Sequence, residues 1–526
     1  MTVTDAQLAA AEQAYLEARD RRDRATIAEA QGKIRPSLRT DAAMAAAAAR
    51  TALAAVVVDP AWPPDDLHAY RVMAQWTTRS AETQASDNDA DRAYVTGESW
   101  GVTAERGFAA LSTRIADEYA QAQGAVDVGD VTLTRLGVLD RLGNEANPER
   151  RRQLFHALEP VWQTIDADGG VASPYQRLLP LSVNLWARDG SPVDRSAAAL
   201  GLSGADVEAH LIAILETWRD GMGANARIEP WDWWYETGAA SRALRAAAPV
   251  GRIRELSNDY HASLGADPLA LGVGFDLFPR LDRPPVPVAY TEFGGRPRIL
   301  ADGARRPARA WIMATYTTGG LGELTELMHE SGHAIHLAAI DTRPAFADWP
   351  DSDAFTEALA ELTALDAAEP SWQAHWLGAG VPESASLRGR YAAVMLDVCW
   401  ALFEIRLHAD PERDPSDVWA DLTSTYLDIE PHREVSWWAM RGQLVQEPGY
   451  MVNYALAAII AADLRAAIRA ARGDWSTGDP GWYDWVSAQI FCWGLERSGR
   501  DVLVDVLGRT PTADALTVEI GRGRAR

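Results

Sequence analysis

Residues 329–333 read His-Glu-Ser-Gly-His, and this run constrains the fold more than any other part of the chain. Two histidines four residues apart lie on the same face of an α-helix, so their imidazoles can converge on one metal ion. Glu330 lies one position further on, turned by about 100° around the helix axis. From there a carboxylate reaches a metal-bound water instead of the metal, which is the position of a general base. The run therefore predicts a helix that carries a metal site.

The residues around this run predict an amphipathic helix that begins near Leu321. Its apolar positions recur at intervals of three, four and seven residues, which is typical of one face directed toward a core: Leu321, Leu324, Met328 and Ile335. The histidines at 329, 333 and 336 fall on a different stripe of the same helix. Their rings are therefore expected to lie off the packed face.

Strand-forming residues precede this helix. Val286–Phe293, Arg296–Leu300 and Arg309–Tyr316 are rich in β-branched and aromatic side chains. Gly294-Gly295 and Asp302-Gly303 separate them, and such pairs are typical of tight turns. The pattern predicts a small antiparallel meander beside the motif helix.

A catalytic zinc ion usually takes three protein ligands and leaves a fourth position for water. The residue six positions after His333 is alanine, which excludes the longer three-histidine pattern. His336 is on the same helical side but too far along the axis to share the ion comfortably. We therefore expect His336 to support a ligand or to contact substrate.

The remaining candidate for the third ligand is a carboxylate from the next helix. Residues 354–366 predict that helix, and Glu357 comes 24 residues after His333, a length that suits a turn and an antiparallel return. Glu361 is one helical turn further on, where it could accept the second ring hydrogen of a ligating histidine. Glu357 is the preferred ligand, although the two carboxylates could exchange these roles.

The composition of the 526-residue chain limits the choice of partners. The net charge is −24, which argues against binding to nucleic acid and to anionic membrane surfaces. No basic-then-apolar leader opens the sequence, so we expect a cytoplasmic protein. Most of the remainder predicts helix, with the longest segments at 4–30, 39–58, 104–123, 147–167 and 203–221.

Several segments together resemble the zinc peptidases of the thimet oligopeptidase and oligoendopeptidase F family, and more distantly angiotensin-converting enzyme. Residues 329–336 look like the extended metal motif of that family, and Phe355-Thr-Glu357-Ala resembles its third-ligand segment. Residues 308–317 and 229–235 are similar to segments upstream of the active site in these relatives. Residues 448–454 resemble the late tyrosine segment. The matches span about half of the chain.

The resemblance implies a mainly α, two-lobed protein with a deep central channel and a small β-sheet beside the motif helix. It divides the chain into an N-terminal helical lobe at 1–225 and a catalytic lobe at 226–526, interwoven into one large domain. It implies one zinc ion per chain, and short peptides as substrates. Glu330 would activate a zinc-bound water and then protonate the leaving amine. Tyr454, and also Tyr450, would donate a hydrogen bond to the developing oxyanion.

One departure from the family weakens this expectation. The late histidine that precedes the tyrosines has no counterpart, because Val445 or Gln446 occupies its place. His432 is distant in sequence, and Arg441 or Gln443 could compensate.

Two alternatives stay open; the first rests on this departure, whereas the intact His329, Glu330, His333 and Glu357 argue against the second. The first is a zinc amide hydrolase with one dedicated substrate, and the second is a non-catalytic relative that binds peptide. Manganese or cobalt could also replace zinc, because geometry more than affinity selects among these ions.

Overall fold

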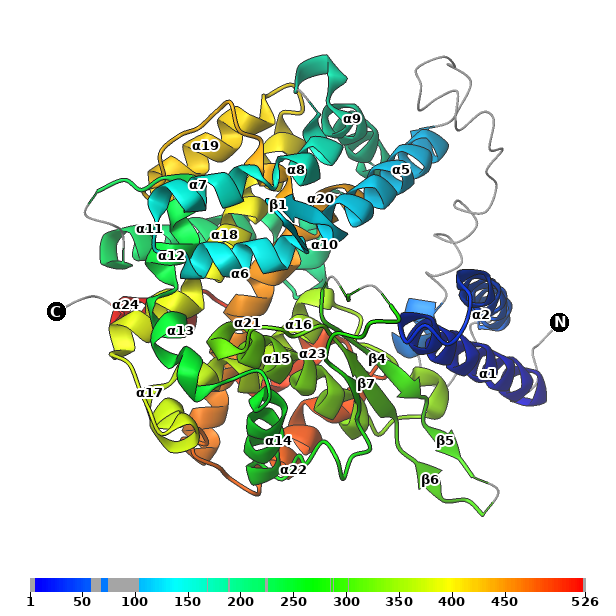
Figure 1. The fold of residues 1–526 in the computed structure, drawn as a ribbon. Coiled ribbons are helices and arrows are strands. Elements are labelled where there is room, and N and C mark those ends of the chain that lie inside the picture. Colours follow the sequence, from blue (N-terminus) through cyan, green and yellow to red (C-terminus); the bar gives the residue numbers. More distant parts are fainter. Residues whose placement is uncertain are drawn as a thin grey trace. The chain divides into compact units, whose positions relative to one another are not determined.

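The computed structural model shows a mostly α-helical protein with a few short strands (Figure 1). The chain divides into two compact units, and each unit is built from three separate stretches. Unit 1 comprises residues 1–85, 248–367 and 467–509, and unit 2 comprises residues 86–247, 368–466 and 510–526. The structure describes residues 5–57, 68–73, 104–167, 169–187, 190–222, 226–283, 285–286, 288–300 and 302–523.

The mainly α class predicted from the sequence is confirmed. The lobes suggested at 1–225 and 226–526, and the channel between them, stay predictions.

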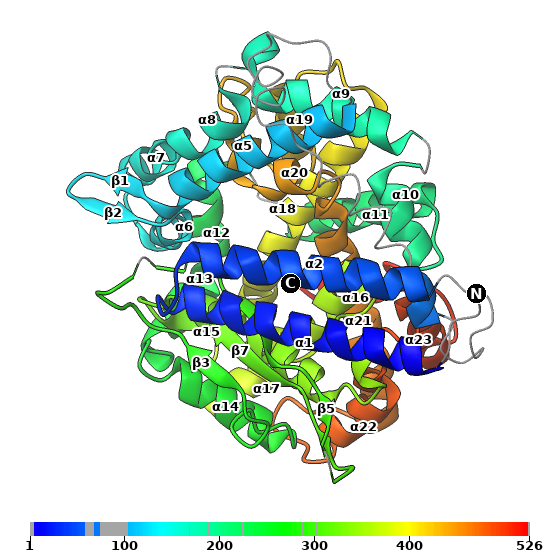
Figure 2. The same cartoon turned by 90° about the vertical axis from the view of Figure 1, so that its right-hand side faces the viewer.

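Helices make up most of unit 1. They are α1 (Asp5–Ala30), α2 (Pro36–Val56), α14 (Ile253–Ser263), α15 (Gly320–Ala339), α16 (Asp353–Ala364), α22 (Trp482–Gln489) and α23 (Gly499–Leu507). The first two helices lie side by side (Figure 2). The pair α15 and α16 packs together, and α14 packs against α15. The predicted motif helix and the helix that follows it are therefore both present.

The sheet of unit 1 has three strands in the order β3 (Gly274–Asp276), β7 (Arg309–Met313) and β4 (Tyr290–Gly295). The central strand β7 is parallel to β3 and antiparallel to β4. Helix α1 packs against β4, and α15 packs against both β4 and β7. Alternate side chains of β4 point to these two helices: Glu292 lies 3.6 Å from Arg22 of α1, and Thr291 contacts α15. The sheet therefore lies between α1 and α15.

The small sheet beside the motif helix is present, but the predicted meander is wrong in its pairing. Among the strands of the described residues, β5 (Arg298–Ile299) pairs with β6 (Arg305–Arg306) alone, in a separate two-stranded hairpin. Gly294 and Gly295 lie inside β4 instead of forming a turn. A Cβ atom at Gly294 would lie 2.3 Å from the Trp311 ring, and a Cβ atom at Gly274 on β3 would lie equally close to that ring. These glycines accommodate an indole on the central strand, which sequence periodicity does not reveal.

Unit 2 is also helical. Its helices are α5 (Ala104–Gly124), α6 (Arg135–Asn144), α7 (Pro148–His156), α8 (Glu159–Asp166), α9 (Pro174–Trp186), α10 (Pro192–Ala199), α11 (Gly204–Met222), α12 (Trp233–Thr237), α13 (Ala239–Leu244), α17 (Pro370–Trp372), α18 (Glu383–Ala409), α19 (Pro415–Tyr426), α20 (Gln443–Gln446) and α24 (Asp514–Arg522). Its hairpin is β1 (Val126–Val128) with β2 (Val131–Leu133). Aromatic side chains fill its core; Trp400, for example, stacks on Trp419 with centroids 4.8 Å apart.

Helix α21 (Met451–Arg472) connects unit 2 to the last stretch of unit 1. It is long and apolar enough to cross a membrane by composition, with a mean hydropathy of 1.5 in its most apolar window. However, 78% of that window is buried inside the protein, as in the core helix of a globular domain.

The long predicted helices are found with small shifts at their ends, except for one. Residues 147–167 form the two helices α7 and α8 instead of a single helix. Pro160 lies in the first turn of α8, where its missing N–H is tolerated. In the middle of a continuous helix the same proline would remove a hydrogen bond and clash with the preceding turn. Residues 4 and 58, at the ends of two other predicted helices, lie outside the described part of the chain.

Candidate metal centre

Helix α15 begins at a tightly packed glycine turn. Gly319 has a φ of +67°, and a Cβ atom there would lie 2.4 Å from the backbone nitrogen of Val250. The carboxylate of Glu323 accepts hydrogen bonds from the backbone N–H groups of Thr317, Thr318 and Gly319. An acidic side chain at a helix N-terminus also interacts favourably with the helix dipole. The start of the motif helix is therefore fixed by local contacts.

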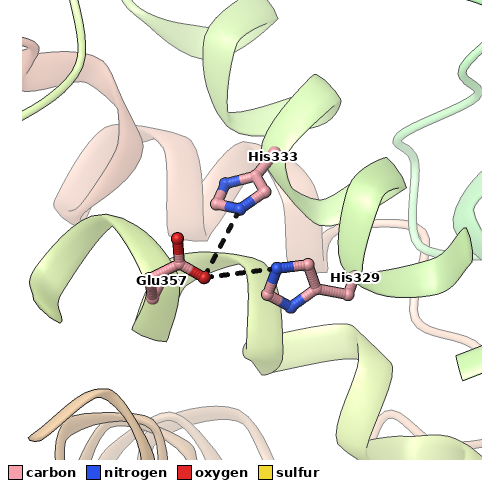
Figure 3. A group of neighbouring side chains, drawn as sticks. All are labelled: His329, His333 and Glu357. Carbon is pink, nitrogen blue, oxygen red and sulfur yellow. Dashed lines mark ion pairs between the residues drawn. The ribbon is translucent and has the colours of Figure 1, made fainter. Parts of the chain in front are cut away.

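The structure brings three side chains of unit 1 together: His329 and His333 of α15, and Glu357 of α16 (Figure 3). We refer to these three residues as the metal group. One ligand atom from each residue lies within 4.8 Å of the other two. Glu357 Oε2 is 3.4 Å from His329 Nε2 and 3.9 Å from His333 Nε2. Within the described residues, this is the group of His, Cys, Asp and Glu side chains whose spacing could hold a metal ion.

The donors and their separations fit a tetrahedral zinc site. Ligand atoms about 2.0–2.1 Å from a tetrahedral ion lie about 3.3–3.4 Å from one another. The observed 3.4 Å and 3.9 Å are close to this value, so small side-chain movements would complete the arrangement. Two imidazoles and one carboxylate are also a common ligand set of catalytic zinc.

Glu361 orients the first imidazole. Its Oε1 atom lies 2.8 Å from Nδ1 of His329, which leaves Nε2 directed toward Glu357. Burial alone would lower the pKa of His329, but the carboxylates of Glu357 and Glu361 raise that pKa well above its usual value. Of the two carboxylates that the sequence left open, Glu357 thus lies in the metal group and Glu361 lies behind His329.

The second imidazole has a different environment. The ring of His333 packs edge-on against Trp349, with centroids 5.4 Å apart. Its Nδ1 atom is buried and has no hydrogen-bond partner among the described residues. Burial, together with the nearby His329, lowers the pKa of His333 to about 3. Packing on an indole therefore orients this ring, and Trp349 was not singled out by the sequence.

Glu330 is buried beside the metal group and contacts strand β4. The hydroxyl of Thr291 lies 2.7 Å from Oε2 of Glu330 and 2.9 Å from the backbone carbonyl of the same residue. Burial raises the pKa of Glu330. The sequence predicted Glu330 as the general base but gave no sign of Thr291, because nothing in a strand pattern marks a threonine as a partner.

His336 does not belong to the metal group. Its ring is buried between Trp349 and Phe491, at centroid distances of 6.1 Å and 5.2 Å. Burial lowers its pKa to about 3. Trp349 thus contacts both His336 and His333, and the supporting role of His336 stays a prediction.

Gly332 and Ser331, in the middle of the motif, lie where α15 packs against α16 and α14, respectively. A Cβ atom at Gly332 would lie 2.4 Å from the backbone oxygen of Ala360 on α16. The glycine therefore permits the close approach that brings Glu357 to the histidines. The hydroxyl of Ser331 lies 3.2 Å from the hydroxyl of Ser257 on α14.

The predicted tyrosines lie in unit 2, at the start of α21. The ring centroids of Tyr450 and Tyr454 are 5.4 Å apart. Nε2 of Gln443 donates a hydrogen bond of 3.3 Å to the hydroxyl of Tyr454. The buried carboxylate of Glu404 accepts hydrogen bonds from the backbone N–H groups of Gly449 and Met451. The tyrosine segment is thus held by its own unit, and the catalytic role of both tyrosines stays a prediction.

The residues that could replace the missing late histidine lie in different surroundings. Val445 is buried. Arg441 forms an ion pair with Asp397. His432 contacts Glu229 and Glu434, each at 2.7 Å. Two residues of this set contact Tyr454: Gln443 through its hydrogen bond, and Arg441, whose guanidinium lies 5.9 Å from the centroid of the tyrosine ring.

A second buried polar cluster lies in unit 1, and we call it the ionic network: Arg19 and Asp23 of α1, Arg296 and Asp348. Asp348 lies 2.9 Å from Arg19 and 3.1 Å from Arg296, and Arg296 lies 2.7 Å from Asp23. Burial would raise the pKa of Asp348, but Arg19 and Arg296 lower it overall. The network connects α1 to the residue that precedes Trp349.

Comparison with solved structures shows that this fold is shared with known peptidases. A crystal structure assigned as an oligoendopeptidase F superposes with a TM-score of 0.55 at 16% identity, over 99% of this chain and 96% of that one. PZ peptidase A, solved with an inhibitor, superposes with a TM-score of 0.57 at 14% identity, over 100% of this chain and 97% of that one. No family profile and no curated protein matches the sequence. The mainly α fold is thus one that peptidases adopt.

Proposed function

We propose that this protein is a zinc-dependent metallopeptidase that hydrolyses peptide bonds in short oligopeptides. The observation that carries the proposal is the convergence of His329, His333 and Glu357, with Glu361 behind the first ring. Glu330 lies next to this group, on the same helix. The shared fold of solved peptidases adds support, because one of those structures is an oligoendopeptidase F by assignment.

In this proposal each residue has one task. His329, His333 and Glu357 would hold one zinc ion per chain. The ion would polarise the peptide carbonyl and make a water more acidic. Glu330 accepts a proton from the attacking water, which makes the water a better nucleophile. It then passes a proton to the departing amine, which makes the amine a better leaving group. The contribution of Tyr450 and Tyr454 rests on sequence resemblance alone.

Zinc is preferred because of the donor set. Two imidazoles and a carboxylate suit zinc, whereas magnesium and calcium prefer oxygen donors. Manganese and cobalt remain alternatives that geometry could favour. Elemental analysis of the purified protein decides among them, and we expect close to one zinc per chain.

The activity is tested by digestion of a mixed peptide library, with products identified by mass spectrometry. We expect cleavage of many short peptides and none after chelation of the metal, with recovery on adding zinc. Cleavage of a single amide compound only would indicate a dedicated hydrolase. No cleavage by the zinc-loaded protein would favour a binding role.

The role of Glu330 is tested by Glu330→Gln. Because the amide cannot accept the proton, we expect kcat to fall by about 10²–10⁴-fold while bound zinc stays near one per chain. Unchanged peptide cleavage by the Glu330→Gln variant contradicts the mechanism.

A further inference from the structure

The carboxylate of Glu330 has one side-chain hydrogen-bond donor among the described residues, the hydroxyl of Thr291. The two oxygen atoms are 2.7 Å apart, a normal length for a hydrogen bond from a hydroxyl to a carboxylate. Glu330 is 6% exposed, so water contributes little to holding this side chain. The hydroxyl of Thr291 therefore controls where the carboxylate points.

The backbone holds Thr291 in place. Thr291 lies within β4 and opposes Ile312 of β7, on the antiparallel side of the three-stranded sheet. Its neighbour Glu292 faces α1, so the alternation of the strand directs Thr291 toward α15. The branched Cβ atom of threonine restricts χ1. The hydroxyl thus has few alternative positions.

The same hydroxyl also lies 2.9 Å from the oxygen of the backbone carbonyl of Glu330. That carbonyl is in the middle of the continuous helix α15, where carbonyls accept from the N–H group four residues on. The carboxylate oxygen is both closer and negatively charged, so it is the stronger acceptor. The contact with the carbonyl keeps the hydroxyl at the root of the Glu330 side chain.

We propose that Thr291 is a positioning residue for Glu330: its hydrogen bond occupies Oε2 and leaves Oε1 to exchange the proton during hydrolysis. This inference rests on the proposed function, in which Glu330 is the general base. Two carboxylate oxygens that were both free would let the side chain rotate, and only some rotamers would meet the attacking water. Fixing one oxygen selects a single orientation.

The test compares three variants with the wild type: Thr291→Val, Thr291→Ser and Thr423→Val. Valine keeps the shape of threonine and removes the hydroxyl, whereas serine keeps the hydroxyl. Thr423 is the matched control, because it is a buried threonine of unit 2 whose hydroxyl bonds to the carbonyl of Trp419. Measured quantities are kcat and KM on a cleaved peptide, zinc content, melting temperature, and a crystal structure of each Thr291 variant.

For Thr291→Val we expect kcat to fall by about 10–100-fold, because small misplacements of a catalytic group cost this much. KM and zinc content should stay at the wild-type values. Thr291→Ser should recover most of kcat, and Thr423→Val should not lower it. In the valine variant the Glu330 carboxylate should leave the position that it occupies in the wild type and in the serine variant.

Two results overturn the inference: wild-type kcat in Thr291→Val, or a Glu330 carboxylate that has not moved in its crystal structure. A lower melting temperature with unchanged kcat assigns Thr291 a structural role only. If the zinc-loaded wild type cleaves no peptide, the proposed function fails instead. The crystal structures still decide whether Thr291 orients Glu330.

Discussion

Unit 1 contains two buried polar clusters that use their charges differently. In the ionic network, Asp348 and Asp23 each lie within about 3 Å of a guanidinium, so opposite charges compensate one another. In the metal group, Glu357 faces two imidazole nitrogens, and among the described residues no arginine or lysine pairs with it. A metal ion can displace the protons of such imidazoles and bind the nitrogen and carboxylate lone pairs that converge there. The comparison separates a cluster that stabilises the fold from one that can do chemistry.

The largest effect is expected from Glu357→Ala, which removes the only carboxylate of the metal group. The variant should purify with far less than one zinc per chain. Its peptide cleavage should fall by about 10³-fold or more, because the metal supplies several kcal/mol of transition-state stabilisation. The partly exposed position of Glu357 should leave the melting temperature of the metal-free protein nearly unchanged. Full zinc occupancy in this variant would contradict the assignment of Glu357 as a zinc ligand.

The ionic network should respond in stability instead of metal binding. Asp348→Asn removes the charge that compensates Arg19 and Arg296, which stay buried. We expect a loss of about 3–5 kcal/mol in the free energy of unfolding, measured by denaturant titration, with zinc content unchanged. Asp505→Asn is the control, because Asp505 pairs with Arg497 at the surface, and it should cost less than about 1 kcal/mol. Equal effects of the two substitutions contradict a stabilising network.

An intermediate effect is expected from Glu361→Gln. The amide keeps the size of Glu361 but loses the charge that holds Nδ1 of His329. Outer partners of metal-bound histidines typically contribute 10–100-fold in affinity, so the zinc dissociation constant should rise by about that factor. Competition with a zinc chelator measures it. An unchanged constant would show that packing alone orients His329.

The smallest effect concerns a histidine whose ring nitrogens both have partners. His261 is buried, with Nδ1 2.7 Å from the carbonyl of Ser257 and Nε2 3.1 Å from the hydroxyl of Thr363. Burial lowers its pKa to about 4, so the unfolded chain binds a proton below pH 6.5 before the folded protein does. The stability from this residue is therefore complete above pH 6.5 and decreases as the pH falls toward 4.

The difference between pH 7.5 and 5.5 should be smaller in His261→Asn than in the wild type, by about 1 kcal/mol. Denaturant unfolding at the two pH values measures it. Identical pH dependence in both proteins contradicts this account.

The part of the site carried by two neighbouring helices could be predicted from the sequence. His329 and His333 follow from helical periodicity, and Glu357 and Glu361 follow from a short return and the same spacing. Their placement needs only local structure and one tight contact at Gly332.

The remaining contacts join residues far apart in the chain. Tyr15 and Asp348 are separated by 333 positions, and Thr291 and Glu330 belong to a strand and a helix that periodicity does not pair. The predicted strand pairing was wrong for the same reason. Hydrophobic alternation shows which face of a strand is buried but not which strand lies next to it. The indole of Trp311 on β7 fits between β3 and β4 because Gly274 and Gly294 leave room for it.

The division of each unit into three stretches has a consequence for biosynthesis. Unit 1 begins near the N-terminus, yet its last stretch ends at residue 509 of 526. A ribosome must therefore synthesise the chain through residue 509 before this unit can close, and His329 and His333 reach their final surroundings only then. No single proteolytic cut could free the unit intact, and no contiguous gene fragment could transfer it to another protein.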